Sequence, residues 1–162
     1  MKTQKASLLV LLVLSISLFT GQAQTKQSLQ TVFTGMNTEQ LKLAKENKFT
    51  KPDVLALEKV MAATGNQLLE FIKESAGVAP QSLIDKIESE FKSLNAEYAK
   101  ILSGASLTAW KELSNSTKNT LVKRLQSDYF GASKLARTDI LTDLKNGILS
   151  SLIKGFGGED WG

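Results

Sequence analysis

Residues 82–104, SLIDKIESEFKSLNAEYAKILSG, repeat an apolar side chain at alternating steps of three and four. In an α-helix of 3.6 residues per turn, such steps keep these side chains on one face. The stripe consists of Ile84, Ile87, Phe91, Leu94, Tyr98 and Ile101. Its burial is worth on the order of 10 kcal/mol before conformational entropy is subtracted, more than the net stability of many domains. Neighbouring helices, a bound lipid or a membrane surface must therefore cover it.

Helical signals continue along the rest of the chain. Thr50 with Asp53 three residues later is typical of a helix start, and Pro80 suits a first turn. Helix ends are expected at Gly35, Gly77, Gly104 and Gly131, and starts at 37–40 and after 114–117. We predict helices over about residues 26–33, 38–46, 51–74 (with a break possible at Gly65), 80–102, 107–113, 117–130 and 133–154. The fold class is therefore all-α, a single-domain bundle of about five to seven helices.

The first residues, MKTQKASLLVLLVLSISLFTGQAQ, have the features of a secretory leader. Lys2 and Lys5 precede an apolar run, and the small residues Gly21 and Ala23 follow it. The run is shorter than the roughly 20 residues that a membrane span needs. We predict a signal peptide over 1–23, a helical domain over 24–154, a flexible Gly-rich tail over 155–162, and a secreted, extracellular protein.

Composition excludes several kinds of function. The chain has 20 basic and 16 acidic residues, and removing Lys2 and Lys5 with the leader leaves 18 against 16. Without a basic excess, nucleic-acid binding is not expected. The absence of Cys and His removes thiol catalysis, the Ser–His–Asp triad and the commonest metal ligands. We therefore expect no catalytic residues, no cofactor and no enzyme.

Two pairs of carboxylates, Glu70 with Glu74 and Asp139 with Asp143, are spaced four residues apart. Each pair shares a helix face and could bind a hard cation. This spacing is common on solvated helix faces, and the sequence contains no EF-hand loop. We therefore predict no metal site.

The sequence Asn115-Ser116-Thr117 is a glycosylation sequon in a chain expected to be exported. The same stretch is rich in helix N-cap residues, so it also predicts a helix junction. Both interpretations can hold, because helix junctions are exposed. Asn115 is therefore a candidate glycosylation site.

The last predicted helix carries a broader apolar arc than a narrow packing seam requires. Central burial, contact with a greasy ligand and docking on lipid all fit a broad arc. Only Lys145 and Lys154 supply positive charge there, and Asp139 and Asp143 oppose them, so membrane docking is the weakest option. Trp110 fits either the end of the core or the mouth of a ligand site.

Two segments resemble the nematode fatty-acid- and retinol-binding proteins. NTEQLKLAKENKFTKPDVLALEKV is similar to their Thr-Glu start, Lys-rich helix and acidic restart before an Ala-Leu helix. SLIDKIESEFKSLNAEYAKILSG resembles their later amphipathic helix. The likeness spans about two-thirds of the processed chain, and the tail GFGGEDWG departs from it. The resemblance implies a secreted all-α protein that holds a lipid.

The leading hypothesis is a secreted helical carrier of a hydrophobic small molecule such as a fatty acid or a retinoid. The predicted apolar lining consists of Ile87, Phe91, Leu94, Tyr98, Trp110, Leu125, Ile148 and Leu152, with the ligand's polar head group at the rim. Transient membrane contact is compatible with this function, and the oligomeric state is left open. The alternative is a secreted structural or protein-interaction bundle with no small-molecule ligand.

Overall fold

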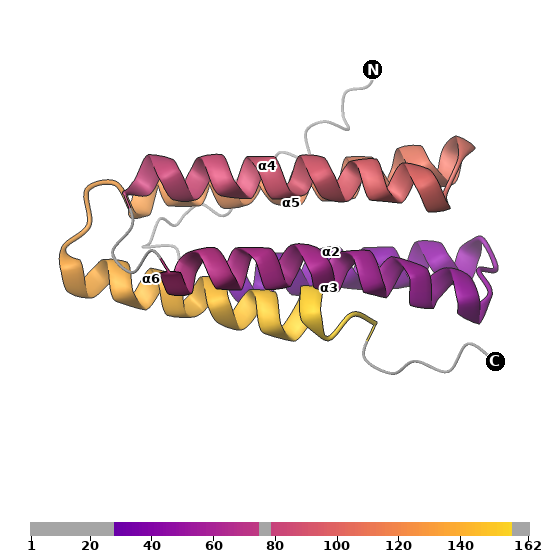
Figure 1. The fold of residues 1–162 in the computed structure, drawn as a ribbon, viewed down its shortest axis with the longest axis horizontal. Coiled ribbons are helices and arrows are strands. Elements are labelled where there is room, and N and C mark those ends of the chain that lie inside the picture. Colours follow the sequence, from indigo (N-terminus) through magenta and orange to yellow (C-terminus); the bar gives the residue numbers. More distant parts are fainter. Residues whose placement is uncertain (1–27, 75–78, 157–162) are drawn as a thin grey trace, which may run out of the picture.

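A computed structural model describes residues 28–74 and 79–156, which are almost entirely helical (Figure 1). The elements are α2 (Leu29–Glu46), α3 (Lys51–Glu74), α4 (Pro80–Ile101), α5 (Gly104–Asp128), α6 (Lys134–Gly147) and the π-helical turn η2 (Ile148–Ile153). These described ranges contain no β-strand, and the predicted all-α bundle is confirmed. The predicted signal peptide, the expected helix end at Gly77 and residues 157–162 of the predicted tail lie outside the described residues.

The helices pack in a closed order around one core. α3 packs on α4, α4 on α5, and α5 on α2, while α6 and η2 pack on α2 and η2 also packs on α3. In Figure 1, α4 and α5 form one layer, and α2, α3 and α6 form the other. The C-terminal segment therefore closes the bundle between α2 and α3.

The helix starts are held by specific side chains. At α3, Thr50 N donates to Asp53 Oδ2 at 3.0 Å, and Asp53 N donates to Thr50 Oγ1 at 3.5 Å, as the sequence predicts. At α2, Ser28 Oγ accepts from Thr31 N at 3.0 Å. Asp143 of the neighbouring helix α6 also caps α2, because its carboxylate accepts from Leu29 N at 2.7 Å and from Gln30 N at 3.2 Å. This carboxylate ties the start of α2 to α6.

The apolar stripe of α4 faces the core. Five of its six residues are buried, and Ile101 at the end of the helix is half-buried. The buried hydrophobic side chains of all the described helices form one continuous cluster. Within the described part of the chain, no helix is both long and apolar enough to cross a membrane.

Two glycines allow helices to approach closely. A Cβ at Gly65 would lie 3.0 Å from the Cβ of Leu152, so α3 and η2 can pack this closely because residue 65 has no side chain. A Cβ at Gly147 would lie 2.6 Å from a ring carbon of Phe33 and 3.0 Å from the Cα of Gln30, so α6 meets α2 in the same way. α3 consequently runs through Gly65 without a break.

Two predicted helix junctions are wrong. α2 continues through Gly35 and the expected start at Asn37, and α5 continues through residues 114–117. The end expected at Gly104 is close to the observed one, since α4 ends at Ile101, and Gly104 itself begins α5 with φ +60°. In α2 and in α5 a continuous buried face spans the expected junction. It consists of Phe33, Met36 and Gln40 in α2, and of Trp110, Ser114 and Thr117 in α5. Tertiary burial therefore overrides the propensity of a single Gly, Asn or Ser.

The C-terminal helix also differs from the prediction. The expected helix over residues 133–154 is divided into α6 and the wider turn η2. The first two residues of the predicted flexible tail are packed, because Phe156 is only 7% exposed and its backbone N donates to Glu58 Oε2 at 2.8 Å. The ordered domain therefore extends at least to Phe156, beyond the predicted boundary at residue 154.

Candidate functional site

The structure brings the eight predicted lining residues into one core. None is more than 1% exposed, and they come from α4, α5 and η2. They are Ile87, Phe91, Leu94 and Tyr98 of α4, Trp110 and Leu125 of α5, and Ile148 and Leu152 of η2. The structure thus places each of them inside the bundle.

A small polar cluster interrupts this apolar core. We call Gln40, Tyr98, Trp110 and Ser114 the central polar cluster; all four are fully buried. Gln40 Nε2 donates to the Tyr98 hydroxyl at 3.2 Å, which links α2 to α4. Gln40 Oε1 and Ser114 Oγ have no hydrogen-bond partner in the protein. Trp110 Nε1 lies close enough to the Tyr98 hydroxyl to lower its pKa but makes no well-aligned hydrogen bond. Buried polar groups are rarely left unpaired, so these unpaired atoms are an unusual feature of the core.

Aromatic packing holds the cluster in place. The Trp110 ring stacks on Phe49 with centroids 5.3 Å apart, and the Tyr98 ring meets it edge-on at 6.4 Å. Phe49 lies in the short link between α2 and α3. Trp110 is therefore a core residue with fixed ring planes, and its indole N–H has a defined direction.

Burial raises the pKa of the Tyr98 hydroxyl well above its usual range. The Gln40 amide and the Trp110 indole beside it lower this pKa by a smaller amount. Tyr98 is therefore a neutral phenol at any physiological pH. A neutral hydroxyl can both donate and accept a hydrogen bond.

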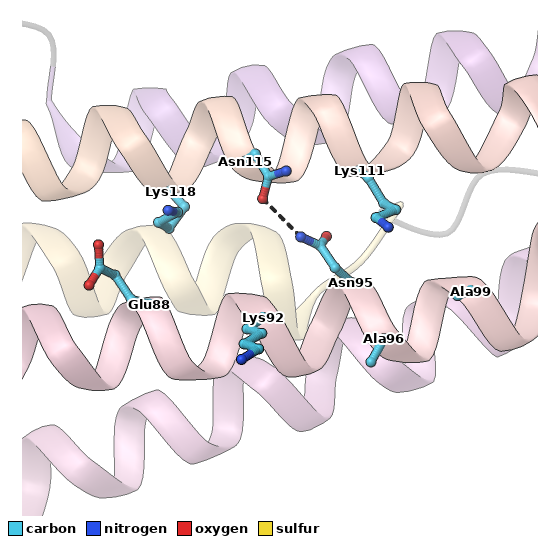
Figure 2. Close-up of a pocket in the computed structure, with 8 residues that line it drawn as sticks. All are labelled: Glu88, Lys92, Asn95, Ala96, Ala99, Lys111, Asn115 and Lys118. Atoms are coloured by element: carbon cyan, nitrogen blue, oxygen red, sulfur yellow. Dashed lines mark hydrogen bonds between the residues drawn. The ribbon is translucent and has the colours of Figure 1, made fainter.

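A basic groove lies along α4 and α5 (Figure 2). This depression of about 530 Å³, the α4–α5 groove, is lined by Glu88, Lys92, Asn95, Ala96 and Ala99 of α4 and by Lys111, Asn115 and Lys118 of α5. Three lysines against one glutamate favour anionic groups. Asn95 Nδ2 donates to Asn115 Oδ1 at 2.8 Å and bridges the two helices (Figure 2). The groove is adjacent in sequence to the cluster, since Lys111 follows Trp110 and Asn115 follows Ser114.

Asn115, the candidate glycosylation site, lies in the middle of α5 and not at a helix junction. Its side chain is exposed and uses Oδ1 to accept from Asn95, while Thr117 of the same sequon is 7% exposed. The predicted junction is wrong, because residues 114 and 117 belong to the buried face of one long helix. Glycosylation of Asn115 stays a prediction.

Sequence reasoning missed Gln40 and Ser114. Each lies on the buried face of its helix, Gln40 in line with Phe33, Met36 and Ala44 of α2. A polar residue at a core position was the available signal. The predicted helix break at 114–117 concealed it for Ser114, because it divided the stripe of α5 in two.

Further depressions on the described surface have volumes of about 200, 230 and 330 Å³. None of the eight predicted lining residues borders any of these or the α4–α5 groove. Within residues 28–74 and 79–156, no group of three or more acidic, His or Cys side chains could hold a metal ion.

Comparison of the chain with models of known protein families, with curated proteins and with solved structures finds no match. The resemblance to the nematode fatty-acid- and retinol-binding proteins therefore stays a prediction.

Proposed function

We propose that this protein is an exported, non-enzymatic carrier of a hydrophobic ligand such as a fatty acid or a retinoid. The observation that carries the proposal is the central polar cluster, in which Gln40 Oε1 and Ser114 Oγ are unpaired and the Trp110 N–H is poorly aligned inside an apolar core. Each buried group without a partner costs about 1–3 kcal/mol. A guest that satisfies them while its hydrocarbon part remains in the core would recover much of that free energy.

The hydrogen-bonding capacity of the cluster is mixed. Trp110 Nε1 can only donate, Gln40 Oε1 can only accept, and the Ser114 hydroxyl can do both. A hydroxyl or a protonated carboxyl group on the ligand both donates and accepts, so it matches this set. An ionised carboxylate has no donor for Gln40 and would pay a large desolvation cost in the core.

The α4–α5 groove offers an ionised head group a second position. Lys92, Lys111 and Lys118 surround a surface where a carboxylate stays hydrated and pairs with ammonium groups. In this arrangement the head group lies at the rim, and the chain enters between α4 and α5. The hydrogen bond from Asn95 to Asn115 would open as the helices separate.

Binding requires the core to expand. Ligand sites usually enclose hundreds of cubic ångströms, whereas the eight predicted lining residues are packed together in the core. The ligand must therefore separate helices at a cost in lost contacts. The expected signature is slower amide hydrogen exchange in α4 and α5 once the ligand fills the opened space.

The test is fluorescence titration of delipidated protein with a fluorescent fatty acid, followed by competition with oleate and with retinol. We expect enhanced emission that the competitor reverses. Ser114→Ala removes a hydroxyl of the cluster and should weaken binding about fivefold to tenfold, in line with one lost hydrogen bond. Ser106→Ala is the matched control, because Ser106 Oγ is also buried and unpaired but lies in the first turns of α5. Absence of any enhancement would overturn the proposal.

A structural or protein-interaction bundle is the second candidate. The observation that favours it is the solid packing of the eight predicted lining residues in one core, with none of them bordering a described depression. This candidate predicts no displacement by oleate or retinol. If the partner is a second copy of the chain, the melting temperature will also rise with protein concentration.

A further inference from the structure

The connection between α5 and α6 holds two large apolar side chains in solvent. We call residues 129–135 the α5–α6 corner; it lies at the end of the bundle opposite the α2–α3 and α4–α5 connections (Figure 1). Phe130 is 41% exposed and Leu135 is 74% exposed. Of the large apolar side chains that the structure describes, Leu135 is the most exposed. The corner is therefore a small apolar surface that no described part of the chain covers.

Hydrogen bonds fix the backbone of this corner. Arg137 Nε donates to Tyr129 O at 3.1 Å, and Arg137 Nη2 donates to Phe130 O at 3.0 Å. The same guanidinium lies 5.2 Å from the centroid of the buried Tyr129 ring. Ser133 caps the start of α6 through its side chain. The backbone that carries Phe130 and Leu135 is thus held in place, and both side chains still lie outside the core.

The charges of the corner have one sign. Residues 129–138 contain Lys134 and Arg137 and no acidic residue. Asp128, which comes just before them, is paired with an arginine of α5 at 3.0 Å. The first acidic residue of α6 is Asp139, in the second turn of the helix. The exposed ammonium group of Lys134 therefore lies in sequence between two exposed apolar side chains, without an acidic neighbour in its own turn.

These residues contribute little to the stability of the fold. An exposed leucine gains little from burial, and Lys134 is the first residue of α6, where the helix dipole disfavours a cation. The first turn of α6 contains no acidic residue that would offset this charge. By contrast, α3 begins with Lys51 but carries Asp53 in its first turn. Local choices that oppose stability are expected at functional surfaces.

A lipid surface matches this combination of side chains. Phenylalanine and leucine enter the boundary between lipid headgroups and acyl chains, and basic residues beside them are attracted to anionic lipids. A turn at the end of a bundle can enter a fluid surface without a cavity of matching shape. The apolar arc of the last helix is not available for this contact, because Leu144, Ile148 and Leu152 are buried.

We propose that the α5–α6 corner docks the protein reversibly on a bilayer that contains anionic lipid. Phe130 and Leu135 enter the interface, and Lys134 lies against the headgroups. This surface is separate from the proposed carrier site, and the proposal does not depend on that function.

The experiment is cosedimentation of the processed chain, residues 24–162, with vesicles. The vesicles contain phosphatidylcholine alone or in equal parts with phosphatidylglycerol. We expect saturable binding to the anionic vesicles that weakens as the salt concentration rises. Leu135→Ala should weaken this binding about tenfold, through the lost apolar contact. Lys134→Gln should weaken it about fivefold, through the lost charge. Adding Phe130→Ala to Leu135→Ala should abolish detectable binding, and circular dichroism checks that each variant is folded.

Leu55→Ala and Lys51→Gln are the matched controls. They change a half-exposed leucine and an exposed lysine at the start of α3, at the opposite end of the bundle (Figure 1). Both should leave vesicle binding unchanged. The proposal is overturned if the anionic vesicles bind no protein, if phosphatidylcholine alone binds as much, or if the corner variants behave like the controls.

A protein partner would give a different result. If the corner is instead an interface between two copies of the chain, sedimentation equilibrium without lipid will show a dimer that Leu135→Ala dissociates, while vesicle binding is absent or unchanged by the variant. That outcome also overturns the proposal. None of these measurements uses a fatty acid or a retinoid, so failure here is distinguishable from failure of the carrier function.

Discussion

Single residues of the central polar cluster determine how the core responds to pH. Because burial raises the pKa of Tyr98, the native state holds the phenol proton where the unfolded chain releases it. The stabilisation is complete below the unfolded pKa of about 10 and is lost as the pH rises above it, by up to about 1.4 kcal/mol per pH unit.

The prediction is that Tyr98→Phe flattens this alkaline decline in stability. Urea unfolding at pH 8 and near pH 11 measures it for both proteins. Tyr129, whose pKa burial also raises, remains in the variant and gives a smaller residual slope. Equal losses in parent and variant would contradict the assignment of the effect to Tyr98.

Asp143 provides a second prediction at this scale. Its carboxylate accepts from the first two N–H groups of α2, which have no partner within the helix. Asp143→Ala should lower the free energy of unfolding by about 1–2 kcal/mol, as the loss of an N-cap does. Asp139→Ala is the matched control, because it removes an exposed carboxylate from the same helix. Similar effects of the two changes would show that net charge matters and capping does not.

At the scale of elements, one helical glycine is needed for close packing and another only weakens its helix. A methyl group at Gly147 would press on Phe33 and on the backbone of α2, so Gly147→Ala should destabilise the protein by about 1–3 kcal/mol. A methyl group at Gly35 would meet nothing within 4 Å, so Gly35→Ala should stabilise α2 by about 0.5–1 kcal/mol. Chemical unfolding of both variants checks the signs. A stabilised Gly147→Ala protein would mean that α6 does not approach α2 this closely.

The elements also show how much a sequence can reveal. The long stripe of α4, Pro80 and the Thr50–Asp53 cap follow from local spacing, and the structure has them as predicted. Gly35 and residues 114–117 also look like boundaries, but the helices run through them, because packing energy exceeds the propensity cost of about 1 kcal/mol. The α4–α5 groove joins residues from separate helices, so no local pattern contains it.

The whole molecule depends on its last segment. α6 and η2 pack against α2, and η2 also packs against α3, so they close the bundle between the first two helices of the described residues. Their buried residues include Leu144, Ile148 and Leu152. Contacts between the two ends of a sequence make folding a property of the entire domain and not of separate hairpins.

The resulting prediction concerns truncation. A chain that ends after residue 132 lacks α6 and η2 and exposes the apolar faces of α2 and α3 that they cover. We expect it to lose cooperative unfolding and to bind a hydrophobic dye, as compact states without fixed packing do. Circular dichroism at 222 nm during urea titration measures the cooperativity. A control chain that ends after residue 156 keeps every contact described above and should unfold in one sharp transition. A sharp transition in the shorter chain would instead show that α2 to α5 form an independent bundle and that the C-terminal segment is an addition to it.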